Sequence, residues 1–163
     1  MLNMKAFSLI ELMLSLAVAA ILFFIAIPCF FDLIEKNRAE AKTQQLVASL
    51  QYARMAALQS GTAITFCKNG RSWCDGQKIV DQNGNVLRTL SIASSQDILI
   101  WSSSLGRSDS ITFLSSGMPN GQQGSFYYCP KGSAKHALAV ILEQTGRVRV
   151  SDVTASGGAI VCN

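Results

Sequence analysis

The first part of the chain is almost entirely apolar, whereas apolar and polar positions alternate through the rest. Nearly every residue from Phe7 to Phe31 is apolar, and the composition after Asp32 is that of an ordinary soluble protein. A bilayer-spanning helix needs about 20 such residues in succession. The pattern therefore predicts a membrane segment at 7–31, followed by a polar domain at 32–163.

The pattern next takes on a helical period. Its apolar residues recur at three- and four-residue spacing, namely Leu46, Val47, Leu50, Ala53, Ala57 and Leu58. This spacing predicts an amphipathic helix whose apolar stripe needs a partner, with an end at Ser60-Gly61. A continuous helix from Phe7 would be about 80 Å long at about 1.5 Å per residue. Its second half would then be the spine against which a sheet packs.

The remaining chain is strand-like and interrupted by turns. Candidate strands lie at 63–67, 78–80, 86–90, 98–101, 111–114, 126–129 and 138–142, and Asn83-Gly84 is a hairpin signal. The 163 residues have room for one modest domain plus an extension. The sequence thus predicts an α+β fold, with one long N-terminal helix packed against antiparallel β-sheet and no internal repeats.

The residues before the apolar segment do not form an ordinary signal peptide, because the small residue Ala6 precedes the apolar core instead of following it. Cleavage after Ala6 would leave the whole segment on the mature protein. Glu11 is unusual there, since a carboxylate at a membrane centre costs on the order of 3 kcal/mol. It would lie at the membrane interface, or pair with the N-terminal ammonium of a neighbouring subunit.

The string from Lys5 to Met13, KAFSLIELM, closely resembles the class III leader and processing site of type IV pilins and type II secretion pseudopilins. The resemblance implies a leader at 1–6, cut by prepilin peptidase between Ala6 and Phe7, and N-methylation of Phe7. It also implies that Glu11 aligns subunits during assembly. The family usually has Gly where this chain has Ala6. The expected location is the inner membrane, crossed once, with the domain in the periplasm before it enters a pilus.

Five cysteines bear on the compartment. Cys29 lies in the apolar segment, and the other four suggest two disulfides if the domain is exported. Of the three possible pairings we favour Cys67 with Cys74, which close a short hairpin, and Cys129 with Cys162, which tie down the C-terminus. Zinc is the competing interpretation, but there is no Cys-x-x-Cys and one histidine.

We find no catalytic constellation in the sequence. His136 has no nucleophile or orienting acid at motif spacing, and no Gly-rich phosphate loop precedes a helix. The expectation is a protein that is not an enzyme, with no cofactor and no metal. The formal net charge of +4 is too weak to name a partner, so any binding argument must rest on where the basic groups lie.

Residues 138–150 indicate a strand, a turn and a second strand. Period-two alternation puts Val148 and Val150 on the core face and leaves Arg147 and Arg149 on the solvent face, about 7 Å apart. This spacing suits successive phosphates of one nucleic-acid strand. Lys131 and Lys135, in the preceding loop, would extend the basic patch. The alternative is that these charges only protect an exposed strand.

The order of helix, short Cys hairpin and strands resembles the GspH/FimT group of minor pilins and pseudopilins. Gly146-Arg147-Val148-Arg149 resembles the Gly-Arg-x-Arg motif of FimT-type minor pilins, which bind DNA during natural transformation. The resemblance implies phosphate contacts for both arginines and a turn at Gly146. The expected partners are double-stranded DNA, other major and minor pilins, prepilin peptidase and the inner membrane. The alternatives are a FimU-like pilin that primes pilus assembly and a GspH-like pseudopilin of type II secretion, neither binding DNA.

Overall fold

The computed structural model describes all residues except 1–8, 95, 105, 107–108 and 163. The chain divides into two compact units, Met1–Lys36 and Asn37–Asn163. All the buried core residues belong to the second unit. This second unit is therefore where side-chain packing determines structure.

The first unit contributes the beginning of helix α1 (Leu9–Ser60). Its large apolar side chains are exposed, Phe24 to 85%. Among the described residues, α1 alone is both long enough and apolar enough to cross a membrane. Its most apolar window has a mean hydropathy of 2.7. The exposed apolar surface fits a segment whose partner is lipid or other helices.

The part of α1 in the second unit is amphipathic, as the spacing predicts. Its buried residues are Ala39, Thr43, Leu46, Ser49, Leu50, Ala53 and Ala57. Leu58, which we placed on the same stripe, is instead 44% exposed. The helix ends at Ser60 because Gly61 turns to φ 64 and donates its N–H to the Ala57 carbonyl at 3.0 Å.

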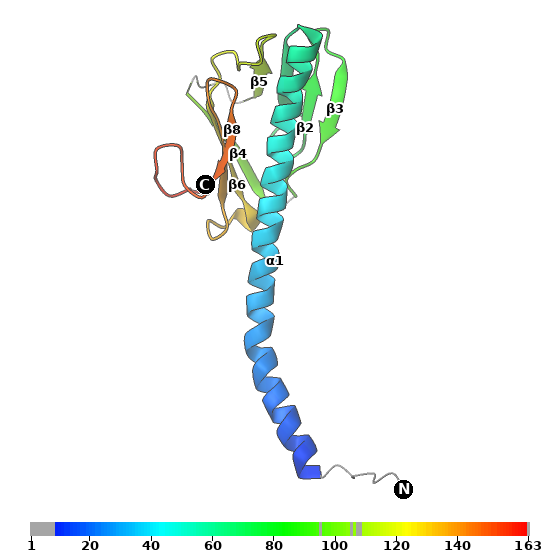
Figure 1. Cartoon of the computed structure of the whole chain (residues 1–163), viewed down its shortest axis with the longest axis vertical. Coiled ribbons are helices and arrows are strands. Elements are labelled where there is room, and N and C mark those ends of the chain that lie inside the picture. The colour runs from blue at the N-terminus through cyan, green and yellow to red at the C-terminus, as the bar shows by residue number, and fades with distance from the viewer. Residues whose placement is uncertain (1–8, 95, 105, 107–108, 163) are drawn as a thin grey trace. The chain divides into compact units, whose positions relative to one another are not determined.

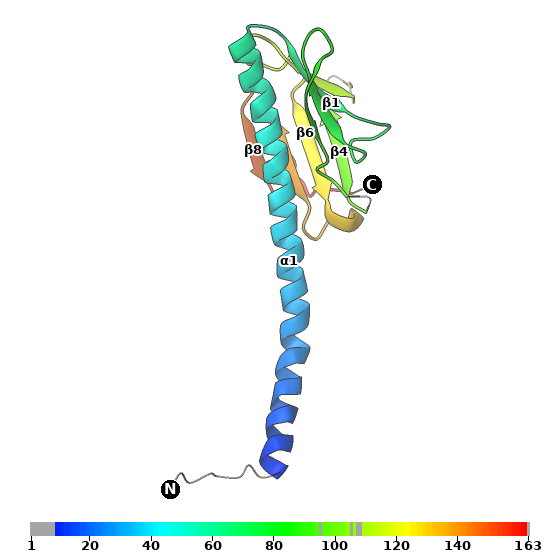
Figure 2. The ribbon, with the colours of Figure 1, turned by 90° about the vertical axis from the view of Figure 1, so that its right-hand side faces the viewer.

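Within the described residues, eight strands form two antiparallel four-stranded sheets, whose arrangement is shown in Figures 1 and 2. The first sheet has the order β3-β2-β1-β5 and the second the order β4-β6-β7-β8. The strands are β1 (Ile64–Lys68), β2 (Gln77–Val80), β3 (Val86–Leu90), β4 (Ile98–Ser103), β5 (Ser110–Phe113), β6 (Gly124–Cys129), β7 (Leu138–Leu142) and β8 (Val148–Ser151), with a short 3-10 helix η1 (Pro130–Gly132) after β6. The predicted strands are all present, but the sequence did not reveal the division into two sheets.

An aromatic cluster joins the two sheets. Phe66 of β1 stacks on Trp73 with 5.5 Å between ring centroids, and Trp73 meets the edge of Phe126 of β6 at 4.9 Å. Trp101 of β4 lies 4.5 Å from Phe126. These rings belong to the same buried core as Leu46 and Leu50 of α1 and therefore lock helix and sheets into one packed unit.

A disulfide joins Cys129 and Cys162, with 6.1 Å between their Cα atoms, as favoured from the sequence. It belongs to a second, smaller buried cluster with Ala139, Ile141 and Ile160. Ala139 and Ile141 alternate along β7 with Val140, which belongs to the main core, so the small cluster lies on the outer face of the second sheet. The bond thus fastens the C-terminal segment to that face.

The predicted pairing of Cys67 with Cys74 is wrong in this structure, because both thiols are free. Phe66 is buried in the core, so its strand neighbour Cys67 faces the opposite side of the sheet. Cys74 packs against the core, where its Sγ accepts the Leu99 N–H at 3.2 Å. Burial raises the pKa of the Cys67 thiol, and the Lys78 charge opposes that effect.

Candidate nucleic-acid interface

The basic hairpin is formed by β7 and β8, with its turn at residues 143–147. The Glu143 N–H donates to the Arg147 carbonyl at 2.9 Å, and the Gly146 N–H donates to the Glu143 carbonyl at 2.9 Å. Gly146 adopts φ 78, a left-handed conformation that favours glycine. The predicted turn is therefore present, and Gly146 makes it possible.

Gly146 also docks the turn onto the rest of the second unit. A Cβ at this position would lie 2.5 Å from the Gly117 carbonyl oxygen. The Gly146 carbonyl accepts a hydrogen bond from Nη1 of Arg54, on α1, at 3.1 Å. The glycine is thus required by conformation and by close packing, so its presence is explained without any ligand.

Beyond the turn, Val148 and Val150 pack against the main core, as the period-two pattern predicts. Arg149, between them, belongs to the outer face of the second sheet and pairs across β7 with Ile141. Arg147 is exposed, just before β8 begins, and makes no ion pair with a described residue. The hairpin consequently presents both guanidinium groups to solvent.

Arg149 is not unpaired. Its Nε lies 3.6 Å from Oε1 of Glu143, and the two side chains are 42% and 40% exposed. A pair this exposed contributes about 0–1 kcal/mol to stability, because water competes for both partners. The pair therefore neutralises charge at the hairpin without fixing the arginine firmly.

A hollow of about 340 Å³ opens beside Arg149 on the outer face. Its lining carries hydroxyl, amide and charged groups from three strands and their loops, from Ser104, Gln123, Ser125, Glu143, Gln144 and Arg149. Neutral side chains of these types contact phosphate and sugar oxygens in many protein–DNA complexes. The polar part of the lining is therefore suited to a nucleic-acid backbone, whereas Ile141, Leu142 and Ala155 make the rest of the hollow apolar.

Lys131 and Lys135 do not extend this patch, contrary to the sequence prediction. Both precede β7, and Leu138 at its beginning pairs with Tyr128 of β6. The basic turn follows Leu142, about 13 Å along the strand at about 3.3 Å per residue. Figure 1 shows η1 and the beginning of β8 at opposite ends of the second sheet. Spacing along the sequence does not reveal this separation, because the straight strand β7 puts the loop before it and the turn after it at opposite ends.

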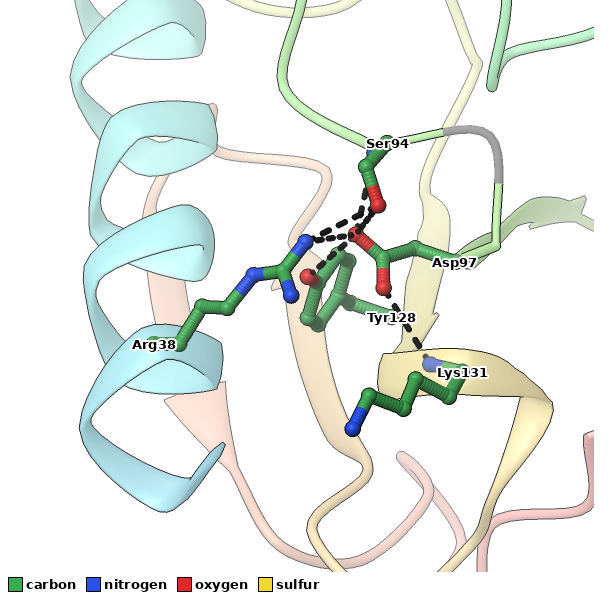
Figure 3. Close-up of polar contacts among 5 residues, drawn as sticks. All are labelled: Arg38, Ser94, Asp97, Tyr128 and Lys131. Carbon is green, nitrogen blue, oxygen red and sulfur yellow. Dashed lines mark hydrogen bonds and ion pairs between the residues drawn. The ribbon is translucent and has the colours of Figure 1, made fainter. Parts of the chain in front are cut away.

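The Lys131 end of the sheet contains a buried carboxylate instead (Figure 3). The side chain of Asp97 is fully buried. Its Oδ2 accepts hydrogen bonds from the Ser94 N–H at 2.9 Å, the Ser94 hydroxyl at 2.8 Å and the Tyr128 hydroxyl at 2.9 Å. Its Oδ1 accepts the Lys131 N–H at 3.1 Å, and Arg38 of α1 forms an ion pair with Oδ2 at 3.3 Å. These contacts connect α1, β6, η1 and the loop before β4.

The electrostatics of Asp97 follow from these contacts. Burial alone raises its pKa, but hydrogen bonds from Ser94, Lys131 and Tyr128 outweigh burial and lower the pKa to about 2. Burial and the neighbouring carboxylate raise the pKa of Tyr128. Asp97 is therefore ionised and acts as a structural anchor. Lys131, which adopts φ 49, is held in that conformation by its N–H bond to Asp97.

Sequence reasoning missed the residues that support the hairpin and the anchor. Arg54 and Arg38 are single basic residues on a helix, and helical positions of this kind usually face solvent. Asp97 stands alone between two short segments, so nothing in its spacing reveals that it is buried. Only Glu143 carried a usable signal, because it lies two residues after Ile141, the residue opposite Arg149, and therefore on the same face of the hairpin.

The other predicted site residues fall elsewhere. Ala6 and Phe7, the expected processing site, lie outside the described residues. Glu11 lies in the first turn of α1 and is exposed. Among the described residues, no group of three or more His, Cys, Asp or Glu side chains is arranged to hold a metal ion.

Comparison with known proteins assigns the chain to a family. The family described as type II transport protein GspH matches residues 42–146, more than half of the sequence. The chain belongs to the GspH family. The match begins in the amphipathic half of α1 and ends at Gly146. Membership of the GspH family therefore rests on the packed unit, and the matched region does not include Arg147 and Arg149.

Two solved structures share the fold of this GspH family member. A crystal structure of the type IV minor pilin FimU from Pseudomonas aeruginosa matches with a TM-score of 0.61 and 22% identity, over 72% of this chain and 90% of that chain. Another crystal form of FimU matches with a TM-score of 0.54 and 22% identity, over 69% and 91%. No curated protein matches the sequence.

Family and fold together show a type IV pilin-like protein of the GspH/FimT group. Membership of the GspH family supports a pilin- or pseudopilin-like role alongside other pilins and points to a structural protein. The apolar beginning of α1 fits a membrane-anchored pilin with a globular domain.

Proposed function

We propose that this chain is a minor type IV pilin that binds double-stranded DNA through its basic hairpin, for DNA uptake in natural transformation. The observation that carries the proposal is the pair of exposed arginines, Arg147 and Arg149, on a hairpin whose turn is hydrogen-bonded to Arg54. Two guanidinium groups on a fixed hairpin can bind DNA phosphates. Such binding does not depend on base sequence, because the backbone charge is the same in every sequence.

The mechanism is electrostatic adhesion. Arg147 and Arg149 replace counterions on neighbouring phosphates, and retraction of the pilus then carries the DNA with it. Two contacts give weak, sequence-independent binding, and log K should fall with log salt with a slope of about −1.8. No bond is made or broken, in keeping with a structural protein.

The N-terminal segment completes the proposal. Prepilin peptidase cuts between Ala6 and Phe7, Phe7 is N-methylated, and the segment 7–31 anchors the protein in the inner membrane. The domain at 32–163 then lies in the periplasm. Glu11 aligns the subunit with other pilins as it enters the filament.

Titration with a fluorescent DNA duplex tests the hairpin. The full chain, in neutral detergent, is compared with Arg147→Gln plus Arg149→Gln. We expect the double variant to bind at least tenfold more weakly at low salt, and the slope of log K against log salt to fall by about 2, because about 0.9 counterions are released per phosphate contact.

The structure supplies a matched control. Lys131→Gln plus Lys135→Gln removes the same amount of charge at the opposite end of the second sheet, and we expect it to leave both the affinity and the salt slope nearly unchanged. If the wild type does not bind at low salt, DNA is not the ligand, and if both double variants bind as well as wild type, the basic hairpin is not the surface that binds it. Without DNA binding, the chain would act as a FimU-like assembly pilin or a GspH-like pseudopilin.

A further inference from the structure

The ion pair between Glu143 and Arg149 lies within the surface proposed to bind DNA, and it sets a limit on that surface. Of the two arginines, Arg147 makes no ion pair with a described residue, whereas Arg149 lies 3.6 Å from the Glu143 carboxylate. A phosphate that approaches Arg149 therefore meets a carboxylate already at the guanidinium. The two arginines are not equivalent as phosphate ligands.

We propose that the Glu143 carboxylate binds Arg149 at the position where a DNA phosphate would bind. DNA binding then exchanges the carboxylate for the phosphate, and Glu143 lowers the affinity for DNA. This inference rests on the proposed function. A carboxylate and a phosphodiester each present anionic oxygens to the guanidinium donors, which makes the exchange chemically direct.

The position of Glu143 makes the exchange possible. Its backbone is fixed by the hydrogen bond from its N–H to the Arg147 carbonyl, but its side chain is 40% exposed. The carboxylate can therefore move into water without disturbing the turn. Because both side chains are exposed, water replaces the pair at little cost when it breaks.

The hollow beside Arg149 indicates where the phosphate goes. It is lined by Glu143 and Arg149 together with the neutral groups of Gln123, Ser125 and Gln144. Its volume of about 340 Å³ far exceeds the roughly 30 Å³ that one water takes up in the liquid. A phosphodiester and its bound water therefore fit beside Arg149. The DNA backbone runs from Arg147 towards this hollow, away from Lys131 and Lys135.

A double-mutant cycle on the full chain in neutral detergent tests the exchange, with the same fluorescent duplex as probe. We expect Glu143→Gln to bind DNA about two- to tenfold more tightly than wild type. The substitution frees Arg149 and removes a negative charge that repels the phosphates. In the Arg149→Gln background, we expect Glu143→Gln to change the affinity by much less. Such non-additivity is the sign of a direct pair.

Glu40→Gln is the matched charge control, because Glu40 is an exposed acid on α1 that does not line this hollow. It should leave the affinity within about twofold of wild type. The proposed exchange at Arg149 is overturned if Glu143→Gln binds DNA no better than wild type, or if Glu40→Gln tightens binding equally. It is also overturned if the effect of Glu143→Gln is just as large in the Arg149→Gln background. The thermal unfolding midpoint should be nearly the same for all four variants, which shows that a change in affinity does not come from unfolding.

These outcomes separate the two proposals. Loss of DNA binding in wild type and Glu143→Gln alike rejects the proposed function and the exchange together. Binding that depends on Arg147 and Arg149 but is indifferent to Glu143 rejects the exchange alone.

Discussion

An arginine pairs with a carboxylate at each end of the second sheet, and the two pairs differ in burial and in the number of hydrogen bonds to the carboxylate. Asp97 is buried and receives hydrogen bonds from Ser94, Tyr128 and the Lys131 N–H in addition to Arg38. Glu143 and Arg149 meet at 3.6 Å with about 40% of each side chain exposed. The first pair cannot open without leaving a buried charge, whereas the second opens into water. The buried pair therefore belongs to the fold, and the exposed pair is available for a ligand.

The largest effect should come from breaking the buried end. Asp97→Ala leaves the buried Tyr128 hydroxyl and the N–H and hydroxyl of Ser94 without their acceptor. Each buried polar group left unsatisfied costs about 1–3 kcal/mol, so the total should be about 3 kcal/mol or more. Denaturant unfolding followed by tryptophan fluorescence measures this, because both tryptophans lie in the core. Glu143→Ala at the exposed end should cost less than about 1 kcal/mol. Equal losses from the two variants would contradict the distinction between the ends.

The next effect concerns the support of the exposed end. Gly146→Ala places a Cβ 2.5 Å from the Gly117 carbonyl oxygen at φ 78. Left-handed strain and this clash together should cost about 2–3 kcal/mol. Gly84→Ala is the control, because Gly84 has a similar φ of 84 with nothing within 4 Å of the added Cβ. We expect about 1 kcal/mol there from strain alone. Similar values for both would show that the docking onto Gly117 and Arg54 adds nothing.

The smallest effect is the response of the buried end to acid. The pKa of Asp97 is lowered to about 2 in the folded protein, against about 3.9 unfolded. A lowered folded pKa contributes stability that is fully present above pH 4 and lost as the pH falls towards 2, about 2 kcal/mol in all. Urea unfolding between pH 5 and pH 2 measures the loss, and Asp97→Asn should flatten it. If the variant loses as much stability as wild type over this range, Asp97 is not the group that titrates.

The sequence was sufficient where a feature depends on neighbouring residues. Amphipathic spacing located the buried stripe of α1 from Leu46 to Ala57, and Gly61 and Gly146 marked the end of the helix and a turn. Period-two alternation placed Val148 and Val150 correctly. These features follow from backbone geometry, which repeats every few residues and is visible in the order of side chains.

Relations between distant segments were the part that sequence reasoning could not supply. The Cys67–Cys74 pairing failed because Cys67 faces the side of its sheet opposite the core, whereas Cys74 packs against it. Lys131 and Lys135 were placed with the arginines because the chain joins them closely, although β7 carries them to the other end of the sheet. Proximity along a chain does not set direction across a sheet.

The sequence by itself determined an apolar N-terminal segment, an α+β fold of one long helix with antiparallel strands, and a turn bearing two arginines. Only the tertiary structure decided that the strands form two sheets, that Asp97 anchors α1 to η1, and that Glu143 shares Arg149. The reason is physical. Helices and turns are specified by local hydrogen bonds and periodicity, whereas burial and ion pairing arise when segments far apart in the chain exclude water together.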